Sequence, residues 1–138
     1  MLVDAGPLLA LMDAGERRHA TCRELLETWP GTLFVPQTVV AEIAYLAAER
    51  LGTHAEVRFL NDLTNGTLID TDVVPSDWGR IAELVWTYRD MPLGTTDASI
   101  VAIAERMGVT QIATLDHRHF SAVQPGHCEA FELLPDLG

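Results

Sequence analysis

The stretch TDASIVAIAERMGVTQIATL, residues 96–115, predicts a helix that leads directly into a short strand. Its first part is apolar on most sides, which is typical of a buried helix. The apolar positions are Ile100, Val101, Ile103, Ala104 and Met107. Gly108 suits the end of that helix, and the strand-forming residues 111–115 follow it. A buried helix joined to an apolar strand is the repeating unit of a parallel α/β sheet.

The same alternation continues in both directions along the chain. Apolar spacing and turn residues predict helices at 5–12, 19–28, 37–51, 53–63, 77–89 and 96–107, and strands at 1–4, 33–35, 67–70, 111–115 and 131–134. We therefore expect an α/β protein with three layers, α/β/α, in which helices cover both faces of a central, mostly parallel sheet. With 138 residues, the chain has the size of one domain.

The composition indicates the cellular compartment of the protein. The chain is 48% hydrophobic, and no apolar run approaches the roughly 18–20 residues of a membrane span. The opening residues MLVD carry no basic region, so we expect no signal peptide. Cys22 and Cys128 fit neither a metal-binding pair nor a disulfide framework, and we expect plain thiols. These features predict a soluble, cytoplasmic protein without membrane contact.

The charge is strongly acidic. Twenty Asp and Glu residues face nine basic residues, all of them arginine, for a formal net charge of −11. The absence of lysine excludes P-loop phosphate binding and Schiff-base chemistry. The acidity also disfavours broad binding to nucleic acid, which normally needs a basic surface. A nucleic-acid role would have to be local or depend on bound cations; otherwise the acids serve a basic protein partner or solubility alone.

Three aspartates are expected at one edge of the sheet. Asp4 ends the first strand, and Asp116 follows the strand at 111–115. If both strands are central and parallel, their carboxylates stand at the same edge, where α/β sheets bind ligands. Asp97 lies in the first turn of the buried helix, at the end that packs beside that edge. The topology thus predicts a cluster of carboxylates.

A fourth acid joins the same region. Glu42 interrupts an apolar helical strip, which would be costly unless it borders a polar pocket. Each acid also has an ordinary explanation: Asp4 as a helix N-cap, Asp97 as a partner of the helix dipole, Asp116 as a turn residue and Glu42 as a side chain that reaches solvent. Their convergence on one crevice favours a functional site.

Clustered carboxylates need a compensating charge. Two of them about 4 Å apart repel by about 4 kcal/mol at an effective dielectric of 20. A hard divalent cation offsets this repulsion, and ligands that are all oxygen select Mg²⁺ or Mn²⁺ over zinc. Such a cation can activate water for attack on a phosphodiester, so hydrolysis of nucleic acid is the chemistry that the cluster predicts.

Four segments resemble one family in order and spacing. They are VDAGPLLAL at 3–11, VAE at 40–42, LGTTDASIVA at 93–102 and TLDHRHF at 114–120. Together they resemble the PIN-domain proteins, and in particular the short bacterial VapC toxins of toxin–antitoxin pairs. The last segment resembles the closing T-x-D-x-x-x-F element of that family. The resemblance extends from residue 1 to about residue 131.

The resemblance implies a single PIN domain over residues 1–138 with an α/β/α fold. It implies a Mg²⁺- or Mn²⁺-dependent endoribonuclease toxin that hydrolyses RNA by attack of metal-activated water, leaving a 5′-phosphate and a 3′-hydroxyl. A transfer or ribosomal RNA would be the substrate, a VapB-type antitoxin the inhibitor, and a homodimer the usual state. The catalytic and metal-binding residues would be Asp4, Glu42, Asp97 and Asp116, with Thr114 in support.

Other polar and aromatic residues each have more than one possible role. Arg118 is a candidate for holding a phosphate, because a guanidinium grips it with two hydrogen bonds; the alternative is a surface arginine paired with an acid. His117 and His119 would point to one side of a strand, and metal, substrate or antitoxin contacts stay open for them. We expect Trp78 and Trp86 in the core or at a dimer contact rather than stacked on bases.

Three other functions share some of these sequence features. A phosphatase of the haloacid-dehalogenase type also begins with a strand that ends in Asp, but it needs an acid where Gly6 stands and a downstream lysine. A binding module without catalysis would use the acidic pocket to receive a basic peptide or a metal. A PIN nuclease of RNA maturation would share the quartet, although the small size of the chain favours the toxin.

Overall fold

Five short strands form the centre of the molecule. The computed structural model describes residues 1–138. The strands are β1 (Leu2–Val3), β2 (Phe34–Pro36), β3 (Ile69–Thr71), β4 (Gln111–Ala113) and β5 (Glu132–Leu134). They lie in the order β3-β2-β1-β4-β5, and every neighbouring pair is parallel. The predicted parallel α/β sheet is confirmed.

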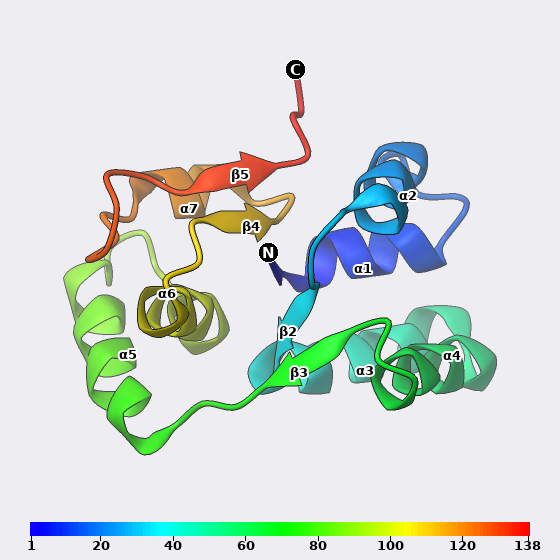
Figure 1. The fold of residues 1–138 in the computed structure, drawn as a ribbon, viewed down its shortest axis with the longest axis horizontal. Coiled ribbons are helices and arrows are strands. Elements are labelled where there is room, and N and C mark those ends of the chain that lie inside the picture. The colour runs from blue at the N-terminus through cyan, green and yellow to red at the C-terminus, as the bar shows by residue number, and fades with distance from the viewer.

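Seven helices cover the two faces of this sheet. They are α1 (Ala5–Met12), α2 (His19–Thr28), α3 (Gln37–Leu51), α4 (Thr53–Thr64), α5 (Pro75–Thr87), α6 (Thr95–Met107) and α7 (His117–Ala122). Figure 1 shows α1 to α4 on one side of the sheet and α5 to α7 on the other. This division follows from right-handed crossovers: the chain leaves β1 in one direction and returns to β4 on the opposite side. The expected three-layer α/β/α architecture is therefore present.

Helix α6 is the most buried helix. All seven residues of the run 98–104 are buried, and Ile100 and Ile103 are completely enclosed. They belong to a single cluster of 26 buried apolar residues that also contains Leu2 and Ile112 of the central strands. Because α6 is enclosed, the position of its first turn is fixed relative to the ends of β1 and β4.

Several helix boundaries differ from the sequence prediction by one or two residues, and one helix was not predicted. Helix α5 begins at Pro75 instead of residue 77, because proline is tolerated in a first helical turn and the Asp77 carboxylate accepts a hydrogen bond from the Val74 amide at 2.9 Å. Helix α7 was not predicted. It begins after Asp116, whose side chain accepts a hydrogen bond from the His119 amide at 3.1 Å.

Several smaller expectations can be compared directly. Trp78 and Trp86 are 51% and 68% exposed, so the prediction of a core position is wrong for both. Cys22 and Cys128 are free thiols, as expected. No helix combines the length and the hydrophobicity that a membrane crossing requires.

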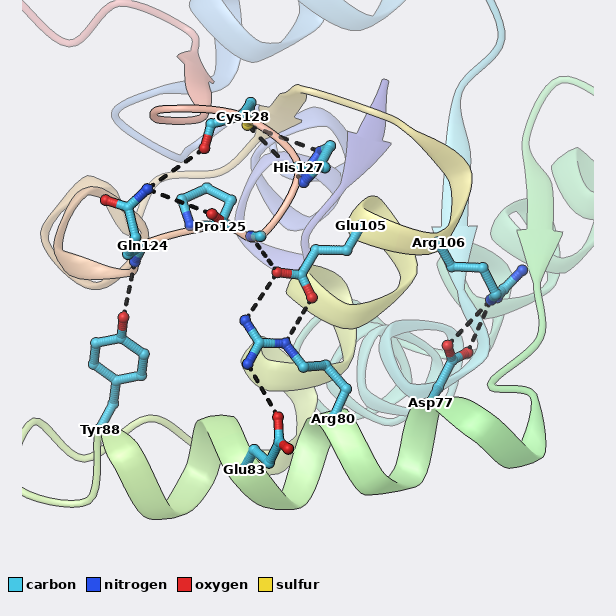
Figure 2. Close-up of polar contacts among 11 residues, drawn as sticks. Asp77, Arg80, Glu83, Tyr88, Glu105, Arg106, Gln124, Pro125, His127 and Cys128 are labelled. Carbon is cyan, nitrogen blue, oxygen red and sulfur yellow. Dashed lines mark hydrogen bonds and ion pairs between the residues drawn. The ribbon is translucent and has the colours of Figure 1, made fainter.

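Ion pairs fasten α5 to α6, and a hydrogen bond joins α6 to the C-terminal segment (Figure 2). The Arg80 guanidinium donates to both Glu105 oxygens at 2.7 and 2.9 Å, and the Gly126 amide donates to the same carboxylate. Nearer the start of α5, the Arg106 Nε lies 3.1 Å from both oxygens of Asp77. Asp77 is almost completely buried, so Arg106 compensates a charge that would otherwise be unpaired in the interior.

The Arg106→Ala variant should therefore lose about 2–3 kcal/mol of unfolding free energy, since it leaves the buried Asp77 carboxylate without its cation. Urea unfolding followed by circular dichroism measures the loss. Arg23→Ala is the matched control: it breaks the exposed Arg23–Glu27 pair and should cost less than about 0.5 kcal/mol. Equal losses in the two variants would contradict this account.

Candidate active site

The four predicted acids line one cavity. This cavity of about 470 Å³ lies beyond the carboxyl ends of the central strands, and its lining consists of Asp4, Ala5, Gly6, Glu42, Asp97, Leu115 and Asp116. Asp4 follows β1 and Asp116 follows β4, the adjacent strands from which the chain departs in opposite directions. Such a switch point opens a crevice at the sheet edge, which is where α/β proteins bind ligands.

Thr114 holds two of these acids in place. Asp4 is 9% exposed; one of its oxygens accepts from the Ala5 amide at 2.8 Å and the other from the Thr114 hydroxyl at 2.9 Å. Thr114 is fully buried, and its hydroxyl oxygen accepts from the Asp116 amide at 3.0 Å. The ends of β1 and β4 are thus connected through one side chain. The N-cap role considered for Asp4 is present as well, since Asp4 caps α1.

A hydroxyl pair joins the helices that carry the other two acids. The Ser99 hydroxyl donates to the Thr96 carbonyl oxygen at 2.6 Å in the first turn of α6, and the Thr38 hydroxyl lies 2.6 Å from it. This contact joins the starts of α3 and α6. Asp97 therefore faces the cavity from α6, while Glu42 reaches the rim from α3 as a solvent-exposed side chain.

The carboxylates are held at an electrostatic cost. Burial raises the pKa of Asp4, and partial desolvation at the cavity rim together with the Asp4 charge raises the pKa of Glu42. Burial raises the pKa of Asp97 to about 6, with further contributions from Asp4 and Asp116. No arginine lines the cavity to neutralise these charges. Four oxygen-donor side chains without an arginine partner fit a hard divalent cation such as Mg²⁺ or Mn²⁺.

The residues after Asp116 differ from the sequence prediction. His117 and His119 lie on helix α7 and not on a strand, so they do not share a side. The His117 Nε2 lies 3.1 Å from the Thr114 carbonyl oxygen, whereas the His119 Nδ1 lies 2.7 Å from an Asp116 carboxylate oxygen. Arg118 is exposed between them and forms no ion pair.

A larger cavity lies elsewhere. It measures about 740 Å³ and is lined by 17 residues, ten of them hydrophobic, from α1, α2, α4 and their connections. None of the four acids borders it. The clustered carboxylates of the smaller cavity are therefore the better candidate for chemistry. At that cavity, a Cβ on Gly6 would lie 3.3 Å from the Leu115 side chain, so the second acid of the phosphatase alternative would require Leu115 to shift.

Comparison with known proteins assigns this chain to a family. A family model described as the PIN domain matches residues 1–124. The chain belongs to the PIN-domain family. Over 135 residues this PIN domain is 36% identical to Ribonuclease VapC26 of Mycobacterium tuberculosis, a match that covers 98% of the chain and 100% of that protein. The resemblance to VapC proteins inferred from the four segments is thereby confirmed.

A solved structure agrees on the fold. The PIN domain superposes on the crystal structure of Mycobacterium tuberculosis VapC20, a sarcin–ricin loop cleaving toxin, with a TM-score of 0.75 and 21% identity. The superposition covers 80% of this chain and 85% of VapC20. The α/β/α arrangement around the parallel sheet is thus common to both proteins.

The raised pKa of Asp97 predicts how stability depends on pH in a chelator. Between its ordinary pKa and about 6, the folded protein binds more protons at Asp97 than the unfolded chain does. The free energy of unfolding should therefore fall as the pH rises through that window and stay low above it. The Asp97→Asn variant lacks this titrating group, so its stability should not fall in that window. At about pH 7.5 the variant should therefore be more stable than the parent by about 1 kcal/mol. This value is smaller than the pKa shift alone implies, because solvent screens the partly exposed carboxyl.

Urea unfolding of both proteins with chelator, at about pH 4 and about pH 7.5, tests this expectation. Added Mg²⁺ should then stabilise the parent protein and leave Asp97→Asn unchanged, because a ligand that binds only the folded state raises the free energy of unfolding. If the variant is less stable than the parent at the higher pH, the ionised Asp97 carboxylate does not destabilise the folded protein, and the prediction is wrong.

Proposed function

We propose that this PIN domain, with residues 1–138 acting as one unit, is a Mg²⁺- or Mn²⁺-dependent endoribonuclease and the toxin of a type II toxin–antitoxin pair. The observation that carries the proposal is the convergence of four carboxylates, from the ends of β1 and β4 and from α3 and α6, on one cavity. The 36% identity to Ribonuclease VapC26 over nearly the whole chain supports the nuclease activity.

Asp4, Glu42, Asp97 and Asp116 would hold the cation in this proposal. When bound, the cation supplies Lewis-acid stabilisation of the charge that develops on the phosphate and lowers the pKa of water. Thr114 acts as a positioning residue, since its hydroxyl fixes the Asp4 carboxylate and the backbone of Asp116. These fixed carboxylates make the site preorganised, which lowers the cost of reaching the charged transition state.

Arg118 is the proposed contact for the RNA backbone. It is exposed on α7, two residues after Asp116, and no carboxylate pairs with its guanidinium. An unpaired arginine this close in sequence to a cavity acid can grip a phosphate with two hydrogen bonds. Together with the cation it gives a local positive region on a chain whose formal net charge is −11. RNA binding would thus be restricted to the mouth of the cavity.

The similarity to VapC proteins suggests a substrate, an inhibitor and an oligomeric state. VapC20 is a sarcin–ricin loop cleaving toxin, and we propose an exposed loop of ribosomal RNA or a transfer RNA as the substrate. A VapB-type antitoxin would neutralise the protein in the bacterial cytoplasm. For the homodimer, the exposed Trp78 and Trp86 of α5 offer large apolar side chains for contact with a second copy.

Cleavage of total bacterial RNA tests the proposal. With Mg²⁺ or Mn²⁺, purified protein free of antitoxin should produce discrete fragments that disappear with chelator. Glu42→Gln should lower the cleavage rate by about a hundredfold or more, since it removes a charged ligand at the rim of the cavity. Glu49→Gln is the matched control: it changes an exposed acid on the same face of α3, two turns further on, and should cleave like the parent.

The alternatives predict other results. A binding module without catalysis would give no fragments under either cation, and a nuclease of RNA maturation would trim precursor RNA while leaving mature ribosomal and transfer RNA intact. Loss of activity in Glu49→Gln equal to that in Glu42→Gln would show that general charge, and not the cavity, governs cleavage.

A further inference from the structure

His119 is the one nitrogen side chain that lies within 4 Å of carboxylates of the acidic cavity. Its backbone amide donates to the Asp116 carboxylate at 3.1 Å, which sets the first turn of α7 over the site. Its Nδ1 lies 2.7 Å from an oxygen of Asp116 and 3.9 Å from an oxygen of Asp97. These three side chains form the one cluster in the molecule whose ligand atoms all lie within 4.8 Å of one another; Asp4 and Glu42 border the cavity but are not part of this cluster.

The close approach of His119 and Asp116 is not a hydrogen bond. The Nδ1 is inaccessible to solvent and has no hydrogen-bond partner, although an acidic oxygen lies at 2.7 Å. An ordinary histidine–aspartate pair would align its N–H with the carboxylate. Here the ring nitrogen and the carboxylate oxygen lie side by side without that alignment, and a cation shared by the two atoms would account for the arrangement when Nδ1 carries no proton.

The distances fit the surroundings of one cation. Around an octahedral ion with ligand bonds of about 2.1 Å, adjacent ligand atoms lie about 3 Å apart and opposite ones about 4.2 Å apart. The separations from Nδ1 to Asp116, 2.7 Å, and to Asp97, 3.9 Å, are each about 0.3 Å shorter than these two values, so a small outward shift would place the three atoms around one ion. His117 offers the contrast, because its ring turns away to the Thr114 carbonyl oxygen at 3.1 Å.

We infer that the Nδ1 of His119 is a ligand of the cation held by the acidic quartet, so that the site contains nitrogen and oxygen and binds Mn²⁺ in preference to Mg²⁺. The inference rests on the proposed cation site. Imidazole suits transition metals, whereas Mg²⁺ takes oxygen ligands and keeps several waters. A single imidazole among the carboxylates therefore strengthens Mn²⁺ binding and contributes little to Mg²⁺ binding.

Pulsed electron paramagnetic resonance tests this inference without measuring activity. Mn²⁺ is added to the full-length protein, and nuclear modulation from a coordinated ¹⁴N is recorded. The parent and the His117→Gln control should show the nitrogen coupling, and His119→Gln should lose it. By calorimetry, His119→Gln should bind Mn²⁺ about tenfold or more weakly, while its affinity for Mg²⁺ changes by less than about threefold.

A second variant separates loss of the ligand from loss of structure. His119→Asp replaces the nitrogen by an oxygen ligand, so it should still bind Mn²⁺, show no nitrogen coupling and bind Mg²⁺ at least as well as the parent. Bound Mn²⁺ without nitrogen coupling in the parent would overturn the role of His119 and leave the proposed nuclease intact. If the parent and Asp97→Asn bind Mn²⁺ equally weakly, the cation site itself fails, and with it both proposals.

Discussion

Mutual repulsion among carboxylates is the constraint on which the site depends. Asp4, Glu42, Asp97 and Asp116 border one cavity that no arginine neutralises. Burial and neighbouring negative charge raise the pKa values of Asp4, Glu42 and Asp97, so the folded chain resists ionisation at the place where its acids converge. A fold that maintains such an arrangement needs a compensating positive charge, and a divalent cation supplies it most compactly.

The fold withstands this repulsion because the acids are attached to rigid elements. Helix α6 is enclosed by the core, and its first turn is fastened to α3 through Ser99 and Thr38. Thr114 connects the ends of β1 and β4 from a fully buried position. On the far side of α6, the ion pairs of Arg80 and Arg106 secure α5 (Figure 2). The backbone at each of the four acids is therefore fixed by the core, although the Glu42 side chain is exposed at the rim.

Most of the fold and the quartet could be predicted from the sequence for simple physical reasons. The apolar run of α6 indicated a buried helix, and the alternation of strands and helices indicated a parallel sheet. Asp4 and Asp116 could be assigned to one edge because each follows a strand, and carboxyl ends of parallel strands share an edge. The structure places both residues at the cavity, together with Asp97 and Glu42.

Other features required three-dimensional information. Helix α7 has only six residues and too few apolar positions to show a helical period, so His117 and His119 were treated as lying on a strand. A strand puts residues i and i+2 on one side, whereas this helix directs the two rings to different partners. The exposure of Trp78 and Trp86 could not be foreseen either, because an aromatic residue on an amphipathic helix suits a core or a surface contact equally well.

The central claim is that the acidic cavity exists to hold a divalent cation. Anomalous diffraction from a crystal of antitoxin-free protein grown with Mn²⁺ tests it most directly. The account predicts one strong manganese peak inside the cavity, with carboxylate oxygens of the quartet at about 2.1–2.2 Å from it. A cavity without a peak, or manganese bound only at a distant place such as His127 and Cys128, would contradict the claim.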